Sequence, residues 1–425
     1  NGYARADAAA AVVLEAQTGR VLYAVNETQT LPMASTTKIM TALVALDNAD
    51  LSDIVTTGDN AYGVPGTSIY LQKGEQLTLE QMLYGLMLAS GNDAAVAIAE
   101  HVSGSVSGFC DMMNARARQI GCENTHFVTP HGLPAQQHYT TAYDLALIAR
   151  EAMKNADFRR IVSTQHATIP WHGHDYDRVL TNKNRLLSAY PGALGIKTGY
   201  TSKAGYCFVG SATKNGVTFI SVVFNCGSYA KCWSDTKKLM EYGFTQYVST
   251  SVAELYAMSP KVLEISKYDL NDPPLGKLEL SLNKLSDSTN DTIVTLQSRL
   301  DYLSSNFNDL VAIEYVHDPV APITAGEVMA TLTYYPEEGE PIEYELVASR
   351  SVSRRVLDFP SLDELIADTL NDPNPFPRFT VEIFLFLVAV VAVIWGVVKG
   401  VKRLMGFRSK KPRRKAVKPI SRYYR

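Results

Sequence analysis

The sequence is poor in cysteine, with five in 425 residues. So few thiols, and an odd number of them, exclude a disulfide scaffold as the main source of stability. We interpret Cys110, Cys122 and Cys207 as small buried residues. Cys226 and Cys232 flank a short Gly-Ser turn, and whether they form a disulfide outside the cell is left open. The sequence also has no solenoid-type repeat, so it predicts ordinary globular domains.

Acidic residues are missing from residues 399–425, which hold 12 Lys and Arg. The rest of the chain holds 28 basic against 43 acidic side chains, so an acidic body is joined to a basic tail. Residues 379–398, "FTVEIFLFLVAVVAVIWGVV", lie between them and have almost no polar side chain. A helix of this length spans about 30 Å, the thickness of a bilayer's hydrocarbon core. The sequence therefore predicts a transmembrane helix over 379–398.

Basic residues follow this segment at once, and the positive-inside rule places that end in the cytoplasm. We therefore expect a single-pass protein of the plasma membrane, with the body extracytoplasmic and the tail cytoplasmic. The tail is interpreted as a topology signal that also attracts anionic lipid. The chain begins at Asn1 without an apolar leader, and we expect that a signal peptide has been removed or left out.

The pattern of short apolar runs predicts an α+β domain over residues 1–250. Strand-like runs at 11–16 and 21–25 form a hairpin signal, and a helix-rich stretch covers 35–155. Two more strand-like runs flank an Asn-Gly pair at 215–216, which favours a second hairpin. Strands at both ends of a helical insert predict one antiparallel sheet. Alternating runs predict a small all-β domain over 251–350, and the Pro-rich segment within 351–378 predicts a linker.

Ser35 and Lys38 lie three residues apart at the start of an apolar helix, in "MASTTKIMTALVALD". Residues i and i+3 share a helix face, so Lys38 projects beside Ser35. A serine hydroxyl needs a base to become a nucleophile, and a lysine is a base only if its surroundings keep it neutral. The spacing alone is weak evidence, because Ser-x-x-Lys also begins at Ser211, Ser228, Ser234 and Ser281.

Two further segments complete a candidate site. Ser90, Gly91 and Asn92 interrupt two apolar helical runs, so a turn there presents a hydroxyl and an amide to a cleft. Thr78 and Gln81 form a candidate capping box for the helix that leads into this turn. Lys197 and Thr198, in "GIKTGY", place an ammonium and a hydroxyl on one strand, a pair suited to a substrate carboxylate. Such chemistry needs no metal or cofactor.

These three motifs, in this order, resemble those of the penicillin-binding D-alanyl-D-alanine carboxypeptidases, the serine-type low-molecular-mass group that shares the class A β-lactamase fold. The resemblance covers roughly residues 8–250, including the blocks "TGRVLYAVNETQTLPMASTTKIMTAL" and "TNKNRLLSAYPGALGIKTGYTSKAGYC". The β-rich segment that follows resembles the family's usual second domain. The resemblance implies an extracytoplasmic enzyme of the cell wall, with a part in cell shape.

Carried over residue by residue, the resemblance makes Ser35 the acylated nucleophile and Lys38 its base. Ser90 and Asn92 would handle the leaving group's proton and the substrate amide. Lys197 and Thr198 would hold the terminal carboxylate, and Gly199 continues that strand. The backbone N–H groups of Ser35 and Tyr200 would form the oxyanion hole. The implied substrate is a peptidoglycan stem peptide ending in D-Ala-D-Ala, β-lactams would acylate the same serine, and no nucleic acid is implied.

Two departures from the family pattern stand out. Cys232, next to Lys231, occupies the position where many relatives have a carboxylate-binding arginine, which predicts weaker affinity or binding through Lys231. Relatives also often attach by an amphipathic tail, whereas this chain is expected to cross the membrane. His131 is interpreted as a packed turn residue. The segment 171–177, "WHGHDYD", has metal-ligand chemistry but is interpreted as a polar loop.

Two alternatives remain open from the sequence. A β-lactamase would share the fold and the acylation step but would release the penicilloyl group quickly. Residues in the expected region lack a Glu-x-x-Leu-Asn deacylation motif, which favours the carboxypeptidase. A receptor that binds cell-wall ends or β-lactams without hydrolysis, and signals through the basic tail, would keep the fold without turnover.

Overall fold

The computed structural model describes residues 7–285, 291–336, 341–356 and 379–404. Contacts divide the chain into two compact units, residues 1–355 and 356–425. The predicted domains 1–250 and 251–350 both fall within the first unit, and the boundary between them stays a prediction. Most of the predicted linker 351–378 and most of the basic tail 399–425 lie outside the described residues.

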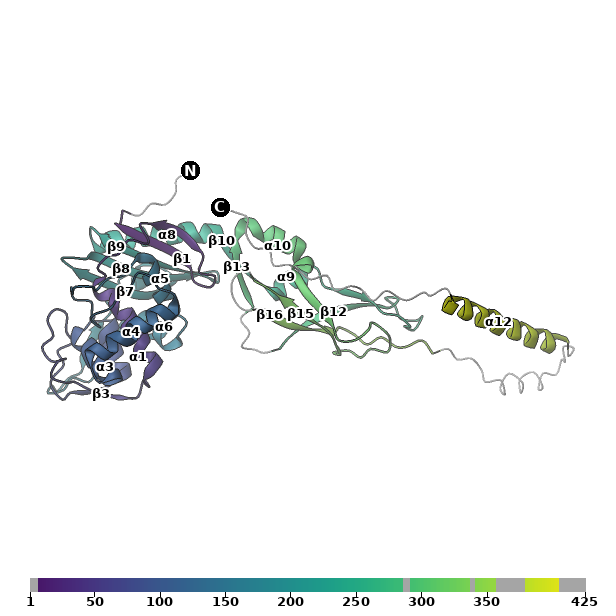
Figure 1. Cartoon of the computed structure of the whole chain (residues 1–425), viewed down its shortest axis with the longest axis horizontal. Coiled ribbons are helices and arrows are strands. Elements are labelled where there is room, and N and C mark those ends of the chain that lie inside the picture. Colours follow the sequence, from purple (N-terminus) through teal and green to yellow (C-terminus); the bar gives the residue numbers. More distant parts are fainter. Residues whose placement is uncertain (1–6, 286–290, 337–340, 357–378, 405–425) are drawn as a thin grey trace. The chain divides into compact units, whose positions relative to one another are not determined.

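A five-stranded antiparallel sheet begins the first unit, with strand order β2-β1-β9-β8-β7 (Figure 1). The hairpin of β1 and β2 pairs with β9, which confirms the prediction that strands from both ends of a helical insert share one sheet. Asn215 and Gly216 turn the β8–β9 hairpin, and both have positive φ, as Asn-Gly turns favour. The strands are β1 (Ala10–Glu15), β2 (Val21–Val25), β7 (Ala193–Thr201), β8 (Gly205–Lys214) and β9 (Val217–Cys226).

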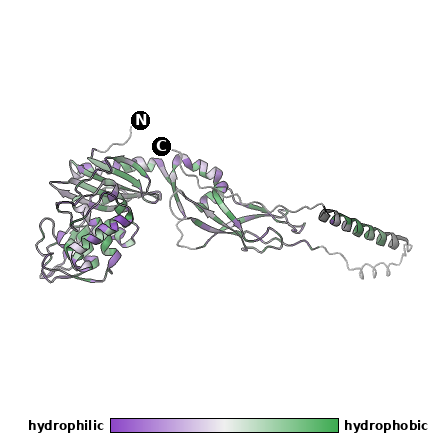
Figure 2. Cartoon of the chain, viewed as in Figure 1, coloured by the Kyte–Doolittle hydropathy of each residue, from purple (hydrophilic) through white to green (hydrophobic). Residues whose placement is uncertain are grey.

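Both faces of this sheet are buried. Alternate residues of a strand point to opposite sides, so one strand contributes to two cores. On β1, Val12 and Leu14 join the core formed with the helical insert, whereas Ala11 and Val13 join a second core with α8 (Tyr229–Gln246). The fold is therefore layered, with the sheet between the insert and α8. Figure 2 shows hydrophobic residues, in green, along the strands of the sheet.

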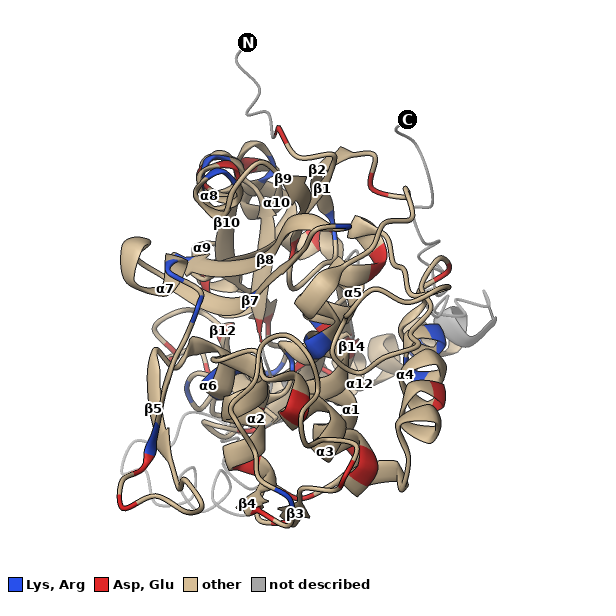
Figure 3. Cartoon of the chain, turned by 90° about the vertical axis from the view of Figure 1, so that its left-hand side faces the viewer, with Lys and Arg blue, Asp and Glu red and all other residues tan. Residues whose placement is uncertain are grey.

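The insert packs beside β7 and contains most of the helices (Figure 3). Its first turn is a 3₁₀ helix, η1 (Ala34–Thr37), rather than the predicted α-helix, and α1 begins at Lys38. The remaining elements are α2 (Leu79–Met87), α3 (Asn92–Ser103), α4 (Val106–Ile120), α5 (Ala142–Ala152), α6 (Ala156–Ser163), α7 (Leu186–Ala189), and the two-stranded pairs β3 (Ile54–Thr56) with β4 (Gln76–Thr78) and β5 (His166–Ile169) with β6 (Arg178–Thr181).

The remainder of the first unit has a second antiparallel sheet, in the order β11-β12-β16-β15-β14. It also contains helices that the prediction of an all-β domain did not include, and Leu303 and Phe307 bury one face of the longer helix. The elements are β10 (Tyr247–Ser251), α9 (Val252–Met258), β11 (Val262–Glu264), β12 (Lys277–Lys284), β13 (Thr292–Leu296), α10 (Gln297–Leu310), β14 (Val311–Tyr315), β15 (Val328–Tyr334) and β16 (Ile342–Ala348).

The second unit contributes one described helix, α12 (Phe379–Leu404), over the segment predicted to cross the membrane. Judged on the described residues alone, the chain has no helix with the length and apolar character needed to span a bilayer.

All five cysteines are free and buried, which confirms the interpretation of Cys110, Cys122 and Cys207. Cys226 and Cys232 are thiols as well, so the disulfide that the sequence left open is not formed.

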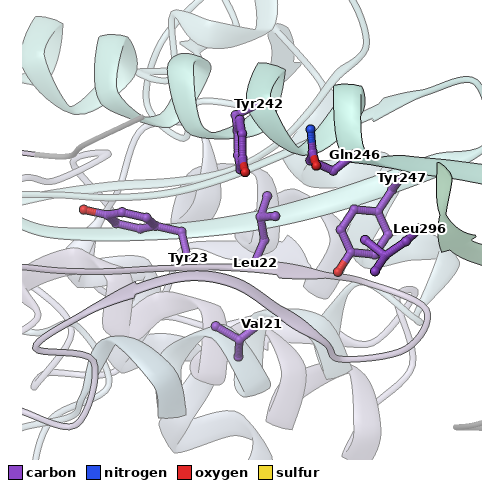
Figure 4. A pocket seen from close by; sticks show the side chains of 7 residues that line it. All are labelled: Val21, Leu22, Tyr23, Tyr242, Gln246, Tyr247 and Leu296. Atoms are coloured by element: carbon purple, nitrogen blue, oxygen red, sulfur yellow. The ribbon is translucent and has the colours of Figure 1, made fainter. Parts of the chain in front are cut away.

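A cavity of about 230 Å³ lies where β2, the end of α8 and β10 meet β13 (Figure 4). It is lined by Val21, Leu22, Tyr23, Tyr242, Gln246, Tyr247 and Leu296.

The predicted capping box at α2 is present. Thr78 Oγ1 accepts from the Gln81 N–H at 3.2 Å, and the Thr78 N–H donates to Gln81 Oε1 at 2.9 Å. We expect Thr78→Ala to lower the free energy of unfolding by on the order of 1 kcal/mol, because one helix-end donor loses its partner. Urea denaturation measures the change. Thr30→Ala, at an exposed position, is the control, and an equal effect of both substitutions would contradict the capping role.

Candidate active site

Ser35 and Lys38 are brought together by the 3₁₀ turn that precedes α1. Lys38 Nζ lies 2.9 Å from Ser35 Oγ. The Lys38 side chain is completely buried, whereas Ser35 keeps part of its surface exposed. Ser35 is therefore partly accessible from solvent, while the Lys38 side chain is shielded from water.

The other contacts of Lys38 fix the direction of its amine. Its Nζ donates to Asn92 Oδ1 at 2.7 Å and to the His131 carbonyl at 2.8 Å. Asn92 Nδ2 donates to the Pro65 carbonyl at 2.8 Å, which sets the amide so that its oxygen faces Lys38. A neutral amine has two hydrogens and one lone pair. With both hydrogens engaged, the lone pair is left to face the Ser35 hydroxyl.

Burial supplies the reason for a neutral amine. Desolvation, followed by the charges of Lys197 and Lys183, holds the pKa of Lys38 well below its usual value of 10.5. Asp93 acts in the opposite direction. Its carboxylate is committed elsewhere, since it accepts from Ser68 Oγ and from backbone N–H groups of residues 69 and 71.

Ser90 lies in the turn between α2 and α3, as the sequence predicted, and Asn92 is the first residue of α3. Both side chains are buried, with 4% and 3% of the residue exposed. Ser90 has a positive φ of 67°, an uncommon conformation for a residue other than glycine. Ser90 Oγ accepts from Lys197 Nζ at 3.0 Å, so the turn is tied to strand β7.

Strand β7 carries Lys197, Thr198, Gly199 and Tyr200 along the edge of the sheet. Burial, and then the charge of Lys183, lower the pKa of Lys197 to about 7. A Cβ at Gly199 would lie 2.9 Å from Ser35 N, so only glycine allows β7 to approach the turn at Ser35 this closely. Tyr200 is 52% exposed and lies at the rim.

The hydrogen bonds link Ser35, Lys38 and Asn92 in one network, and Ser90 with Lys197 in another. Gly199 packs directly against the backbone of residues 35 and 36. The structure thus gathers the predicted residues from three distant parts of the chain.

Two groups that act on the site lysines were not predicted from the sequence. The His131 carbonyl holds Lys38, but a backbone carbonyl leaves no signal in a residue pattern. The His131 ring fits the predicted packed turn: its Nδ1 accepts from the Leu133 N–H, and burial lowers its pKa to about 3. Lys183, just after β6, lowers the pKa of both site lysines. The sequence "TNKN" offered only a loop lysine.

The residues at the family's arginine position do not join this network. Cys232 is fully buried in α8, with Sγ 3.6 Å from the Tyr206 carbonyl. Lys231 forms ion pairs with Asp7 and Asp235. The proposal that Lys231 replaces the arginine is not supported by these contacts.

The chain is similar to known proteins over most of its length. A family described as D-alanyl-D-alanine carboxypeptidase, Peptidase_S11, matches residues 2–228. The D-alanyl-D-alanine carboxypeptidase DacF of Bacillus subtilis is 33% identical over 350 residues, which are 81% of this chain and 85% of the relative. The D-alanyl-D-alanine carboxypeptidase of Streptomyces sp. strain K15 is 39% identical over 53% of this chain and 84% of its own.

Solved structures agree with this likeness. Penicillin-binding protein 5 from Haemophilus influenzae matches with a TM-score of 0.57 at 27% identity, covering 83% of this chain and 100% of the other. These similarities confirm the predicted penicillin-binding α+β fold and favour neither the β-lactamase nor the receptor. The expectation of a serine-type hydrolase is confirmed, and the chain belongs to the Peptidase_S11 family of D-alanyl-D-alanine carboxypeptidases.

Proposed function

We propose that Ser35 is the acylated nucleophile of this carboxypeptidase, with Lys38 as its base, and that the enzyme removes the terminal D-alanine of peptidoglycan stem peptides. One observation carries the proposal. The buried Lys38 amine gives its two hydrogens to Asn92 and His131 and lies 2.9 Å from Ser35 Oγ. Such an amine takes the hydroxyl proton without first losing one of its own.

We propose that these groups carry out the following reaction. Ser35 Oγ attacks the carbonyl carbon between the two D-alanines, and its proton passes to Lys38 Nζ. The oxyanion forms beside the backbone N–H groups of Ser35 and Tyr200. The proton then moves to the leaving nitrogen, with Ser90 as the relay, and D-alanine departs. Water hydrolyses the ester by the reverse proton path.

Lys197 and Thr198 are proposed to hold the terminal carboxylate. Lys197 has no carboxylate partner among the described ion pairs, and its Nζ bonds are to Ser90 Oγ and to the Thr198 carbonyl. An incoming carboxylate supplies the missing negative charge and favours the protonated lysine. A β-lactam presents a carboxylate and a reactive carbonyl in the same relation, which makes it a covalent inhibitor at Ser35.

We also propose that the protein is anchored in the plasma membrane by residues 379–398, with the catalytic part outside and the basic tail in the cytoplasm. The apolar sequence and the basic residues that follow it support this. A role in cell shape is proposed from the same location and activity.

Replacing Lys38 by methionine tests the base. We expect Lys38→Met to slow acylation by penicillin between about 100-fold and 10,000-fold, the usual loss when a general base is removed. Stopped-flow labelling with a fluorescent penicillin gives the rate, and circular dichroism verifies the fold. Lys154→Met is the control because Lys154 is exposed and distant in the sequence. Acylation at the normal rate in Lys38→Met would refute this role.

Replacing Ser35 by alanine tests the nucleophile and the function. The wild-type protein should release D-alanine from a pentapeptide ending in D-Ala-D-Ala, and Ser35→Ala should release none. Mass spectrometry should find the penicilloyl adduct on Ser35, with a thermal transition within a few degrees of wild type for the variant. Ser281→Ala, at another Ser-x-x-Lys sequence, should behave as wild type. An adduct on Ser35→Ala protein would overturn the assignment.

The anchor is tested by fractionation and proteolysis. Protein ending before residue 379 should leave the membrane fraction, and protease added to intact cells should degrade the body and spare the tail. A truncated protein that stays in the membrane fraction would contradict the anchor. A protected body with a degraded tail would invert the topology.

A further inference from the structure

The β5–β6 hairpin has a cavity at its far end that the catalytic site does not use. Its volume is about 380 Å³, and it is formed by the connecting loop 170–177 together with residues 75–77 at the start of β4. The loop joins two strands and is the polar segment that the sequence singled out for its histidines and aspartates. In Figure 3 the hairpin lies at the margin of the helical insert, below β7.

The base of this loop is held firmly. Arg178 Nη2 donates to Glu75 Oε1 at 2.9 Å, and the two side chains are 4% and 1% exposed. Arg178 Nη1 also donates to the Pro170 carbonyl at 3.1 Å, which closes the loop across its ends. The guanidinium lies 5.1 Å from the ring centre of Trp171. A buried ion pair with additional hydrogen bonds fixes geometry, so the cavity is preformed.

The walls combine aromatic rings with polar groups. The Trp171 ring lies 4.3 Å from His174 and 5.7 Å from Tyr176, measured between ring centres. Trp171 Nε1 is a buried donor that has no acceptor among the described residues. Tyr176 is 62% exposed. An exposed aromatic face beside the polar side chains of the loop suits a ligand that has both C–H surface and hydroxyl groups.

The acidic side chains of the loop do not form a metal site with its histidines. Asp175 and Asp177 line the cavity with His172 and His174. Within the described part of the chain, however, there is no group of three His, Cys, Asp or Glu side chains that could hold a metal ion. Polar groups spread around an aromatic wall suit the separate hydroxyls of a sugar ring better than a single cation.

The position of the cavity relates it to the catalytic site. Strand β6 starts at Arg178, and Lys183, five residues on, donates its backbone N–H to the Leu88 carbonyl, two residues before Ser90. At about 3.3 Å per strand residue, the hairpin carries the cavity roughly 17 Å from that turn. The four residues of a pentapeptide that precede the cleaved bond reach about 14 Å when extended. A stem peptide whose D-Ala-D-Ala end lies at Ser35 can therefore place its attachment point near the cavity.

We propose that this cavity, with Trp171 and Tyr176 as its aromatic wall, binds a saccharide ring of the glycan strand that carries the stem peptide. This inference rests on the proposed function, because it names a second part of the same substrate. The sugar's C–H face packs on the aromatic rings, and its hydroxyls donate to Asp175 or Asp177. The enzyme then prefers peptides attached to glycan over free peptides.

The test compares two substrates: a free pentapeptide ending in D-Ala-D-Ala and the same peptide attached to its disaccharide. We expect kcat/KM of the wild-type enzyme to be about tenfold higher for the disaccharide-linked peptide, through a lower KM. Trp171→Ala and Tyr176→Ala should remove this preference and leave kcat/KM for the free peptide unchanged. Tyr302→Ala, at a tyrosine 53% exposed on α10, should keep the preference.

The outcomes separate this inference from the proposed function. Equal kcat/KM for both substrates in the wild-type enzyme, or equal losses on both substrates in Tyr176→Ala, would overturn the saccharide site. Absence of D-alanine release from either peptide would instead overturn the proposed function. In that case, binding of an N-acetylglucosamine tetramer, followed by tryptophan fluorescence, still decides the inference: a shift lost in Trp171→Ala supports it, and no shift refutes it.

Discussion

The candidate site depends on one contact, the approach of a buried lysine amine to a serine hydroxyl. Several separate features of the fold serve it. The 3₁₀ turn places Ser35 beside Lys38, the first residue of α3 is Asn92, and the loop around His131 supplies a carbonyl. Gly199 lets the sheet edge approach the backbone of the same turn. A change in any of these parts moves the amine or the hydroxyl.

The charges around this contact are unbalanced. The charges of Lys197 and Lys183 lower the pKa of Lys38, and the charge of Lys183 lowers the pKa of Lys197. Asp93 is next to Asn92 in sequence, but its carboxylate is used by Ser68 and by backbone donors. Burial is the main cause of the lowered pKa of Lys38, and the neighbouring cationic groups add to it while they also attract a carboxylate. In the proposed mechanism, the same cationic groups thus assist both the activation of Ser35 and the recognition of the peptide terminus.

Much of this site could be predicted from the sequence, because its polar groups are side chains that lie close together in short motifs. These are Ser35 with Lys38, Ser90 with Asn92, and Lys197 with Thr198. The sheet was predictable from its hairpin signals for the same reason. The His131 carbonyl and the close approach at Gly199 were not, since backbone contacts between distant segments leave no residue pattern. Helix α10 was missed because its apolar residues are few and lie among short strand-like runs. The disulfide left open at Cys226 and Cys232 depended on a distance that spacing does not give.

A titration of the Lys38 side chain tests the central claim most directly. With lysines labelled at Cε, the NMR signal lost in Lys38→Met belongs to Lys38, and its chemical shift against pH gives the pKa in the unliganded enzyme. The account predicts a pKa well below the usual 10.5, so that the amine is largely neutral where the enzyme works. A Lys38 signal that titrates near 10.5, like that of an exposed lysine, would contradict it.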